Sequence, residues 1–292
     1  MADGNNLIAF QGEKGANSDT ASRLMFPEMT PLACATFEDA FKAVDSGQAA
    51  LAMIPIENTL AGRVADIHHL LPESGLHIIG EYFLPIHFHL MALKGTKIEQ
   101  IETVHSHIHA FGQCRSIIRK HGWKSVVAGD TAGAAKMIAE TGDSSMAALS
   151  PLLAAELYGL DILERHVEDT NNNVTRFVVL SKTPRHYTRK TADELLMTTF
   201  VFRVRNIPAA LYKAMGGFAT NGVNMTKLES YQLGGEFTAT QFYADIEGHP
   251  DDQNVKLAFE EINFFTDLFD VLGVYPAADM RIAKKTDLIT NS

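Results

Sequence analysis

Short apolar runs alternate with helical patterns from Leu7 to about Lys182, and this alternation constrains the fold more than any other feature. The predicted strands are 7–11, 33–36, 49–54, 76–93, 125–128, 146–149 and 175–180. The predicted helices are 18–25, 37–44, 63–71, 109–120, 132–140 and 152–158. This order predicts βαβ units and a largely parallel sheet. Because the run 76–93 contains Pro85, we expect it to cross between two lobes instead of forming one strand.

A polar, basic segment without periodicity, residues 183–195, predicts a linker to a second domain. The elements expected after it are a strand at 198–205, a helix opened by Pro208, strands at 223–231 and 237–247 joined by the turn Gly234-Gly235, a helix capped by Asp251 or Asp252, and a strand at 271–275. The second helix is expected to carry the apolar stripe Val255, Phe259, Ile262, Phe265 and Phe269. This βαββαβ order predicts a ferredoxin-like domain.

Composition excludes several classes of function. The net charge of -10 opposes binding to a phosphate backbone, and no basic stripe compensates for it, so we expect no nucleic-acid partner. No apolar run approaches the roughly 20 residues that span a bilayer, so we expect no membrane segment. The start lacks the basic region of a secretory signal, which favours a cytoplasmic protein. We therefore expect Cys34 and Cys114 to be buried free thiols.

Four polar motifs follow predicted strands or lead into them. The glycine turn 11–18 could hold an anion at a helix start, or Ser18 could simply cap that helix. Pro55-Ile56-Glu57-Asn58-Thr59 lies where open α/β sheets bind ligands, although Glu57 could be only a helix N-terminal charge. The cluster 171–177 (NNNVTRF) offers several donors at a cleft, or an ordinary Asn-rich turn.

The fourth motif contains His105, His107 and His109. In a strand, these side chains would share one face and could bind a metal ion. The helical pattern that follows favours Ser106 or a histidine as a helix cap, and no HExxH or CxxC supports zinc. No GxSxG elbow supports a serine hydrolase.

Together, these motifs resemble the prephenate dehydratase family in their order along the chain. The matching residues are the glycine turn through Ser18, residues 55–59 with Gly62, Ser106-His107, Gln113-Cys114 and residues 172–177, and the second domain resembles an ACT regulatory domain. The resemblance implies an α/β catalytic domain (1–182) of the bilobal type II periplasmic-binding-protein kind. Its lobe one is about 1–83 plus 168–182 and its lobe two about 84–167. The linker (183–195) and the ACT domain (196–283) follow.

The resemblance also implies the activity and the residues that perform it. The expected reaction is the decarboxylating dehydration of prephenate to phenylpyruvate by a carbon–oxygen lyase of phenylalanine biosynthesis, without metal or organic cofactor. Catalytic positions would be Thr175, Glu57, Asn58, Ser106 and Gln113, and substrate-binding positions Ser18, Thr59, Arg176, Phe177 and Asn173. L-Phenylalanine would be an effector at Ala209, Ala210, Leu211, Asn224, Glu229 and Ser230 of a homodimer or homotetramer.

Thr175 is the expected donor to the leaving hydroxyl, and Glu57 fits beside a dianionic substrate only if it is protonated or paired with a cation. The chain departs from the usual family pattern at several positions. Ile108-His109 stands where Pro-Gln is frequent, Ala209 where Gly is frequent, and Tyr231 where Arg is frequent. The alternatives are an arogenate dehydratase and a ligand-binding or sensor protein without catalysis.

Overall fold

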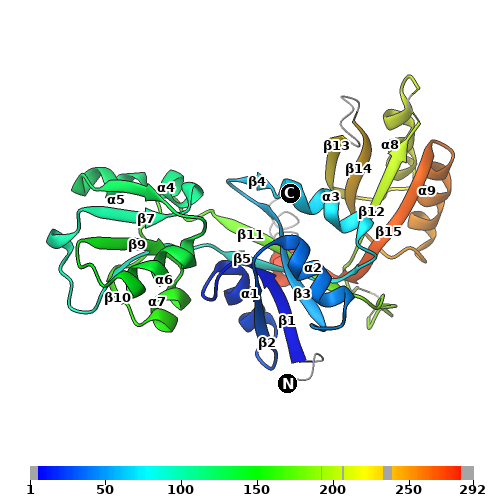
Figure 1. Cartoon of the computed structure of the whole chain (residues 1–292). Helices are drawn as coiled ribbons and strands as arrows, with labels where there is room; N and C mark the ends of the chain where they lie inside the picture. Colours follow the sequence, from blue (N-terminus) through cyan, green and yellow to red (C-terminus); the bar gives the residue numbers. More distant parts are fainter. Residues whose placement is uncertain (1–5, 192, 206, 233–238, 284–292) are drawn as a thin grey trace. The chain divides into compact units, whose positions relative to one another are not determined.

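The computed structural model describes residues 6–191, 193–205, 207–232 and 239–283 (Figure 1). Contacts divide the chain into two compact units. One comprises Met1–Val64 and Tyr82–Phe177, and the other comprises Ala65–Glu81 and Val178–Ser292. Each unit is therefore assembled from segments that are distant in sequence. Among the described residues, no helix combines the length and the apolarity needed to cross a bilayer.

The first sheet has the strand order β2-β1-β3-β11-β5, with β4 paired to β3. Its strands are β1 (Leu7–Gln11), β2 (Thr30–Cys34), β3 (Leu51–Asn58), β4 (Gly62–Arg63), β5 (His77–Pro85) and β11 (Val174–Ser181). The accompanying helices are α1 (Asn17–Met25), α2 (Phe37–Asp45) and α3 (Ala65–Glu73). The middle of β1 is fully buried, and β1 pairs in parallel with both neighbours. This part of the predicted parallel sheet is confirmed.

The second sheet has the order β10-β6-β9-β7-β8. Its strands are β6 (His89–Ala92), β7 (Thr103–Ser106), β8 (Lys124–Val127), β9 (Met146–Ser150) and β10 (Asp161–Glu164). Its helices are a 3-10 turn (Ile98–Gln100), α4 (Ile108–Gln113), α5 (Arg115–His121), α6 (Thr131–Thr141) and α7 (Leu152–Tyr158). Strand β7 is parallel to β8 and β9, whereas β6 runs antiparallel to β9 and β10. The sequence predicted a largely parallel sheet, so the antiparallel pairing of β6 with β9 and β10 was not expected.

Two connections join the sheets, and they lie side by side (Figure 1). The run 76–93 splits into β5 and β6, so the prediction that it is not one strand is confirmed. The Ile86 N–H donates to the Asn173 carbonyl at 2.8 Å, and the Val167 N–H donates to the Phe88 carbonyl at 3.0 Å. These bonds fix the outgoing connection against the returning one.

The sequence-predicted helix 109–120 is two helices, α4 and α5. They meet at Cys114, whose backbone leaves the helical region with φ at -123°. The Asp169 carboxylate accepts from the backbone N–H groups of Arg115 and Ser116 at 2.9 and 3.1 Å, so it caps α5. A residue far away in sequence therefore restarts the helix.

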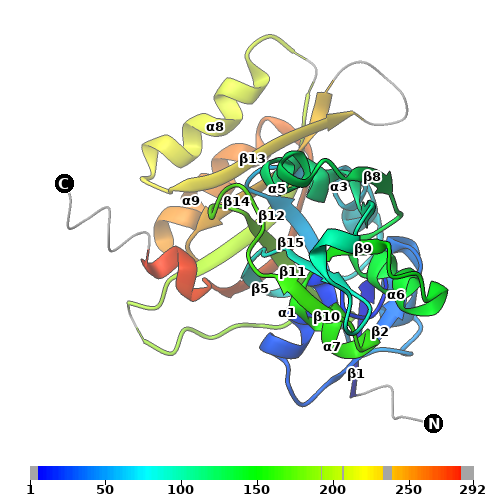
Figure 2. The same ribbon diagram turned by 90° about the vertical axis from the view of Figure 1, so that its left-hand side faces the viewer.

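The third sheet has the order β13-β14-β12-β15, and each strand in it runs antiparallel to its neighbours. Its elements in chain order are β12 (Leu196–Val204), α8 (Ala210–Thr220), β13 (Met225–Gln232), β14 (Ala239–Glu247), α9 (Gln253–Asn263) and β15 (Thr266–Pro276). The βαββαβ order predicted from sequence is confirmed. Both helices contribute to one core against the same sheet (Figure 2). The predicted turn Gly234-Gly235 lies outside the described residues.

Helix α9 is shorter than its apolar stripe suggested. It ends at Asn263, so Phe265 follows the helix and Phe269 belongs to β15. Both side chains still pack against the common core. Asp252 takes the N-cap position without a capping bond from its side chain, and its carboxylate instead pairs with Arg189 at 2.8 Å.

The second unit also contains α3 and the start of β5. The side chain of Glu81 in β5 is fully buried and lies 2.7 Å from the guanidinium of Arg281. His68 in α3 packs edge-on against Tyr243, with ring centroids 5.0 Å apart. A side chain at Gly273 would collide with the Ile78 carbonyl, 2.0 Å from the Cβ position. These contacts tie α3 and β5 to the third sheet.

Candidate active site

A chain of hydrogen bonds gathers four of the predicted catalytic and substrate-binding residues. The Asn58 side-chain amide donates to the Thr175 hydroxyl at 2.9 Å and to the Asn173 Oδ1 at 2.7 Å. The Asn173 amide donates in turn to the Gln113 Oε1. Asn58 ends β3, Thr175 lies in β11, and Gln113 ends α4. The Asn173–Gln113 bond thus connects the ends of first-sheet strands to a helix of the second sheet.

Thr59 holds the two first-sheet segments in register. Its hydroxyl donates to the Asn172 carbonyl at 2.7 Å and accepts from the Val174 N–H at 2.9 Å. The Asn58 Oδ1 accepts from the N–H groups of Leu60 and Ala61, both at 2.9 Å, so its donor face stays turned toward Thr175. The Thr59 hydroxyl thus donates one hydrogen bond and accepts another within the protein, and both bonds position these segments.

Glu57 and Arg176 form an ion pair. The Glu57 carboxylate lies 3.0 Å from the Arg176 guanidinium, and the arginine side chain is 1% exposed. Pairing with a cation is one of the two conditions under which Glu57 was expected to fit beside a dianion. The buried guanidinium neutralises this carboxylate from within the protein.

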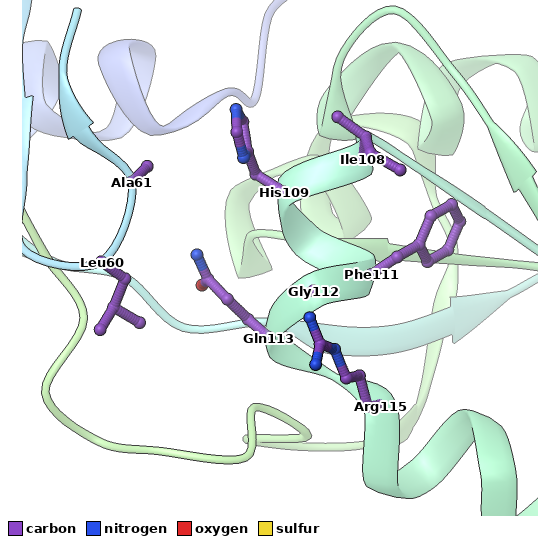
Figure 3. Close-up of a pocket in the computed structure, with 8 residues that line it drawn as sticks. All are labelled: Leu60, Ala61, Ile108, His109, Phe111, Gly112, Gln113 and Arg115. Atoms are coloured by element: carbon purple, nitrogen blue, oxygen red, sulfur yellow. The ribbon is translucent and has the colours of Figure 1, made fainter.

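A pocket of about 580 Å³ opens beside this hydrogen-bond chain. It is lined by Leu60, Ala61, Ile108, His109, Phe111, Gly112, Gln113 and Arg115. Figure 3 shows His109 and Gln113 pointing from α4 toward the loop that carries Leu60 and Ala61. Gln113 belongs to both the pocket and the hydrogen-bond chain. The size is within the range of small-molecule sites, roughly 300–1,000 Å³.

Arg115 and His109 line this pocket, although neither was among the residues predicted for the site. The Arg115 side chain is exposed beside the pocket, and its own backbone is fixed by Asp169. The signal was present in the sequence, because Arg115 directly follows the Gln113-Cys114 motif. An exposed guanidinium is suited to a carboxylate ligand.

Three residues that were predicted for the site are buried and make their contacts inside the protein. The Ser106 hydroxyl is buried and donates to the Leu149 carbonyl at 2.6 Å. Phe177 is buried in the core, and Ser18 lies within α1, where its carbonyl accepts from Ser22. Ala16, not Ser18, is the N-cap of α1. We therefore treat these three as residues that support the site.

The glycine turn packs against the second sheet's helices. Ala16 belongs to the core that contains Ala154 of α7, and a Cβ at Gly15 would lie 2.8 Å from the Ala154 Cα. The Tyr158 hydroxyl donates to the Lys14 carbonyl at 2.8 Å, and Lys136 pairs with Glu13 at 3.2 Å. Two N–H groups that could have cradled an anion are engaged within the turn, because the Gly15 N–H donates to the Asp19 carboxylate and the Ala16 N–H donates to the Glu13 carbonyl.

The three histidines of the fourth motif lie in β7 and at the start of α4, where the rings of His107 and His109 are 5.0 Å apart. His105 lies in β7 and contacts the Thr103 hydroxyl at 3.0 Å. His107 is the N-cap of α4, as the capping interpretation expected, and burial lowers the pKa of its ring. Both cysteines are free; Cys114 is buried, which raises the pKa of its thiol, whereas Cys34 is half-buried, not buried as expected.

The predicted effector positions lie around α8 and β13. Ala209 is the N-cap of α8 with φ at +62°, a left-handed conformation that favours glycine. Ala210 is buried, Leu211 packs against the core, Asn224 precedes β13, and Glu229 and Ser230 lie within it. The Tyr231 ring is buried edge-on to His69, and its hydroxyl accepts from Gln241 at 2.6 Å.

Comparison with known proteins identifies relatives along the whole chain. Residues 8–185 match the family described as prephenate dehydratase. A bifunctional N-acyl-homoserine lactone acylase/prephenate dehydratase of Komagataeibacter europaeus is 49% identical, over 95% of this chain and 98% of the relative. The chloroplastic arogenate dehydratase/prephenate dehydratase 2 of Arabidopsis thaliana is 34% identical, over 92% of this chain and 72% of the relative.

Solved structures agree with these matches. A structure described as a novel type of quorum quenching acylase has a TM-score of 0.88 and 49% identity, and the match covers 94% of this chain and 99% of that one. A prephenate dehydratase from Arthrobacter aurescens in complex with L-Phe has a TM-score of 0.82 and 29% identity, with 98% of each chain covered. The fold of this chain is thus shared over nearly its full length.

Proposed function

The chain belongs to the prephenate dehydratase family, and from that premise we propose that it converts prephenate to phenylpyruvate, water and carbon dioxide. The observation that carries the proposal is the bond from Asn58 to Thr175, continued through Asn173 to Gln113 at the edge of the pocket. These neutral polar side chains come from the first sheet and from α4, and they converge at a pocket where a small anionic ring could bind.

The reaction needs one proton and no external electrons. The bond between the ring and its carboxylate breaks and its electron pair moves into the ring. The carbon–oxygen bond to the hydroxyl opposite then breaks, and the departing oxygen takes a proton to become water. Since the ring becomes aromatic, most of the driving force lies in the substrate. The protein has to position the dianion and stabilise the departing oxygen.

Thr175 is placed to act on the departing oxygen. Its Oγ1 accepts from Asn58, and among the described residues no acceptor is engaged by its hydroxyl hydrogen. Accepting one hydrogen bond strengthens a hydroxyl as a donor to the next acceptor. Because a threonine hydroxyl is a poor acid, we propose that it stabilises charge as a fixed donor instead of transferring its proton outright.

Arg115, and not Arg176, is the cation that we assign to a substrate carboxylate. Arg115 is exposed at the pocket, whereas the Arg176 side chain is buried against Glu57. We propose that Arg176 and Glu57 keep β3 and β11 aligned, and that Ser106, Ser18, Thr59 and Phe177 support the same geometry.

Thr175→Val tests the proposal by removing the hydroxyl while keeping the side-chain shape. Loss of one such donor is expected to lower kcat by about 100- to 1,000-fold, and Thr175→Ser should retain much of the activity. Thr141→Val, in α6, is the matched control and should turn over prephenate normally. Near-normal formation of phenylpyruvate by Thr175→Val would refute the assignment.

Two other activities have support from relatives. Several relatives are named arogenate dehydratases, and parallel rates on prephenate and arogenate distinguish the two substrates. The 49% identical relative is named as an N-acyl-homoserine lactone acylase as well, so release of the acyl chain from such a lactone is the assay for a second activity. A purified protein that forms no phenylpyruvate would instead favour the sensor alternative.

We propose that residues 1–182 form the catalytic domain, 183–195 the linker and 196–283 an ACT domain that binds L-phenylalanine. A relative with bound L-Phe and the βαββαβ order support this organisation. The left-handed Ala209 and the buried Tyr231 alter the effector region. Calorimetry with L-phenylalanine, together with initial rates, tests the effector, and light scattering tests the expected homodimer or homotetramer.

A further inference from the structure

We propose that His87, His166 and Glu168 bind one divalent transition-metal ion of the zinc type. One ligand atom of each residue lies within 4.8 Å of the other two. Among the described residues, no other group of three histidine, cysteine or carboxylate side chains brings its ligand atoms this close together. The proposal concerns a site separate from the residues assigned to prephenate and does not depend on that assignment.

The geometry already approaches that of a coordination site. The Glu168 Oε1 lies 2.6 Å from the His87 Nδ1 and 3.5 Å from the His166 Nδ1. Ligand atoms about 2.0–2.1 Å from a tetrahedral zinc ion are about 3.3 Å from one another. The His166 Nδ1 is therefore close to the spacing that a zinc ion requires from the Glu168 Oε1, and the His87 Nδ1 would have to move away from this oxygen by about 0.7 Å for the ion to bind both atoms.

Glu168 supplies the fixed charge of the site. Its side chain is 2% exposed, and its other oxygen accepts from the Phe88 N–H at 3.0 Å. This bond fixes the plane of the carboxylate and leaves Oε1 facing the two histidine rings. A carboxylate oriented by a backbone donor is a prepared metal ligand.

His166 is held in an uncommon backbone conformation that directs its ring to the same place. Its φ is +53°, and its backbone N–H donates to the His89 Nδ1 at 3.3 Å. The His89 Nδ1 is the acceptor of this bond, and the His89 side chain is itself buried. His89 is thus a positioning residue for one of the ligands.

The donor set selects the class of ion. Two imidazoles and one carboxylate suit zinc and its first-row neighbours, whereas magnesium and calcium prefer oxygen ligands alone. The His87 and His166 side chains are 42% and 57% exposed, so solvent reaches the fourth coordination position. Three protein ligands and one water would complete the tetrahedron.

The ion would join the two connections between the sheets. His87 lies between β5 and β6, and His166 and Glu168 lie between β10 and β11. The next residue, Asp169, caps α5 and donates its backbone N–H to the Gln113 carbonyl at 2.6 Å. An ion at this site would therefore stiffen the segment that carries the pocket residue Gln113.

The test uses the full chain without a histidine tag, stripped of metal with a chelator. Co²⁺ is the probe because its visible absorption reports a tetrahedral nitrogen and oxygen environment, and Zn²⁺ titration by calorimetry gives the stoichiometry. We expect one ion per chain, displacement of Co²⁺ by Zn²⁺, and a Tm that rises with Zn²⁺ concentration.

His166→Asn and Glu168→Gln are the informative variants, since asparagine tolerates a positive φ and both replacements keep polar side chains. Each should weaken Zn²⁺ binding by more than the 10- to 100-fold that loss of an outer partner costs. His186→Ala removes an exposed imidazole elsewhere and should bind normally. Circular dichroism without metal checks that the variants fold. Absence of Co²⁺ absorption in the native chain, or equal affinity in His166→Asn, would overturn the proposal.

Discussion

The contact between the glycine turn and α7 can be tested with one methyl group. Gly15 has φ at +90°, and a Cβ built there would lie 2.8 Å from the Ala154 Cα and 3.1 Å from its Cβ. Gly15→Ala would therefore suffer both an unfavourable backbone conformation and a collision with backbone atoms that cannot rotate away. The control is Gly47→Ala, because Gly47 has φ at +77° and no atom lies within 4 Å of its Cβ position.

The two substitutions share one energetic cost and differ in the other. A left-handed conformation costs an alanine about 1–2 kcal/mol at either position. Overpacking adds about 1–3 kcal/mol at Gly15 alone. The free energy of unfolding should therefore fall by about 1–3 kcal/mol more in Gly15→Ala than in Gly47→Ala. With a urea m-value of about 3 kcal/mol/M, the midpoints would differ by about 0.3–1 M.

Fluorescence of Trp123 follows this unfolding, since it is the one tryptophan of the chain and is 8% exposed beside the second sheet. Equal losses in the two variants would refute the steric argument. They would mean that the turn moves away from α7 at no cost, and that the turn is not a packing contact.

Three further predictions concern the second unit. Arg281→Met should lower the free energy of unfolding by about 3–5 kcal/mol in chemical denaturation, because it removes the guanidinium that faces the buried Glu81. Ala209→Gly should raise it by about 0.5–1 kcal/mol, since glycine accepts φ at +62° at no steric cost, and differential scanning would detect the higher Tm. The hydrogen bond from Arg189 lowers the pKa of Asp252, so this pair stabilises the fold above the unfolded pKa of about 4 and the stabilisation is lost as pH falls through the folded value. Asp252→Asn should cost about 0.2–1 kcal/mol at pH 7, and a denaturation series should show that difference shrinking in acid.

Local patterns were sufficient where local forces decide the structure. Continuous apolar runs predicted β1, β3 and β11, whereas the family resemblance placed Asn58 and Thr175 in one site. The predicted stripe of α9 extended too far because Phe265, which follows the helix, and Phe269, which lies in β15, keep helical spacing and pack against the same core. A spacing of four residues does not distinguish the end of a helix from a strand that packs on it.

Partners from distant segments could not be predicted in this way. The break between α4 and α5 depends on Asp169, and the approach of Arg176 to Glu57 depends on the pairing of β3 and β11. His87 and Glu168 meet only because the two connections lie side by side. Family resemblance supplied the residues of the site but not which of them remain exposed to a ligand. Burial of Ser106, Phe177 and Arg176 emerged only from the folded chain.

The compact units cross the apparent boundary at residues 183–195, and this limits how the protein could be recombined with its relatives. A chimera joined in that segment would take Glu81 from one parent and Arg281 from the other, and likewise His68 and Tyr243. Exchange of the C-terminal portion alone would thus mix two halves of one interior. A functional chimera would have to take α3 and the first half of β5 from the same parent as the third sheet. Residues 65–81 and 178–292 would therefore have to be exchanged together.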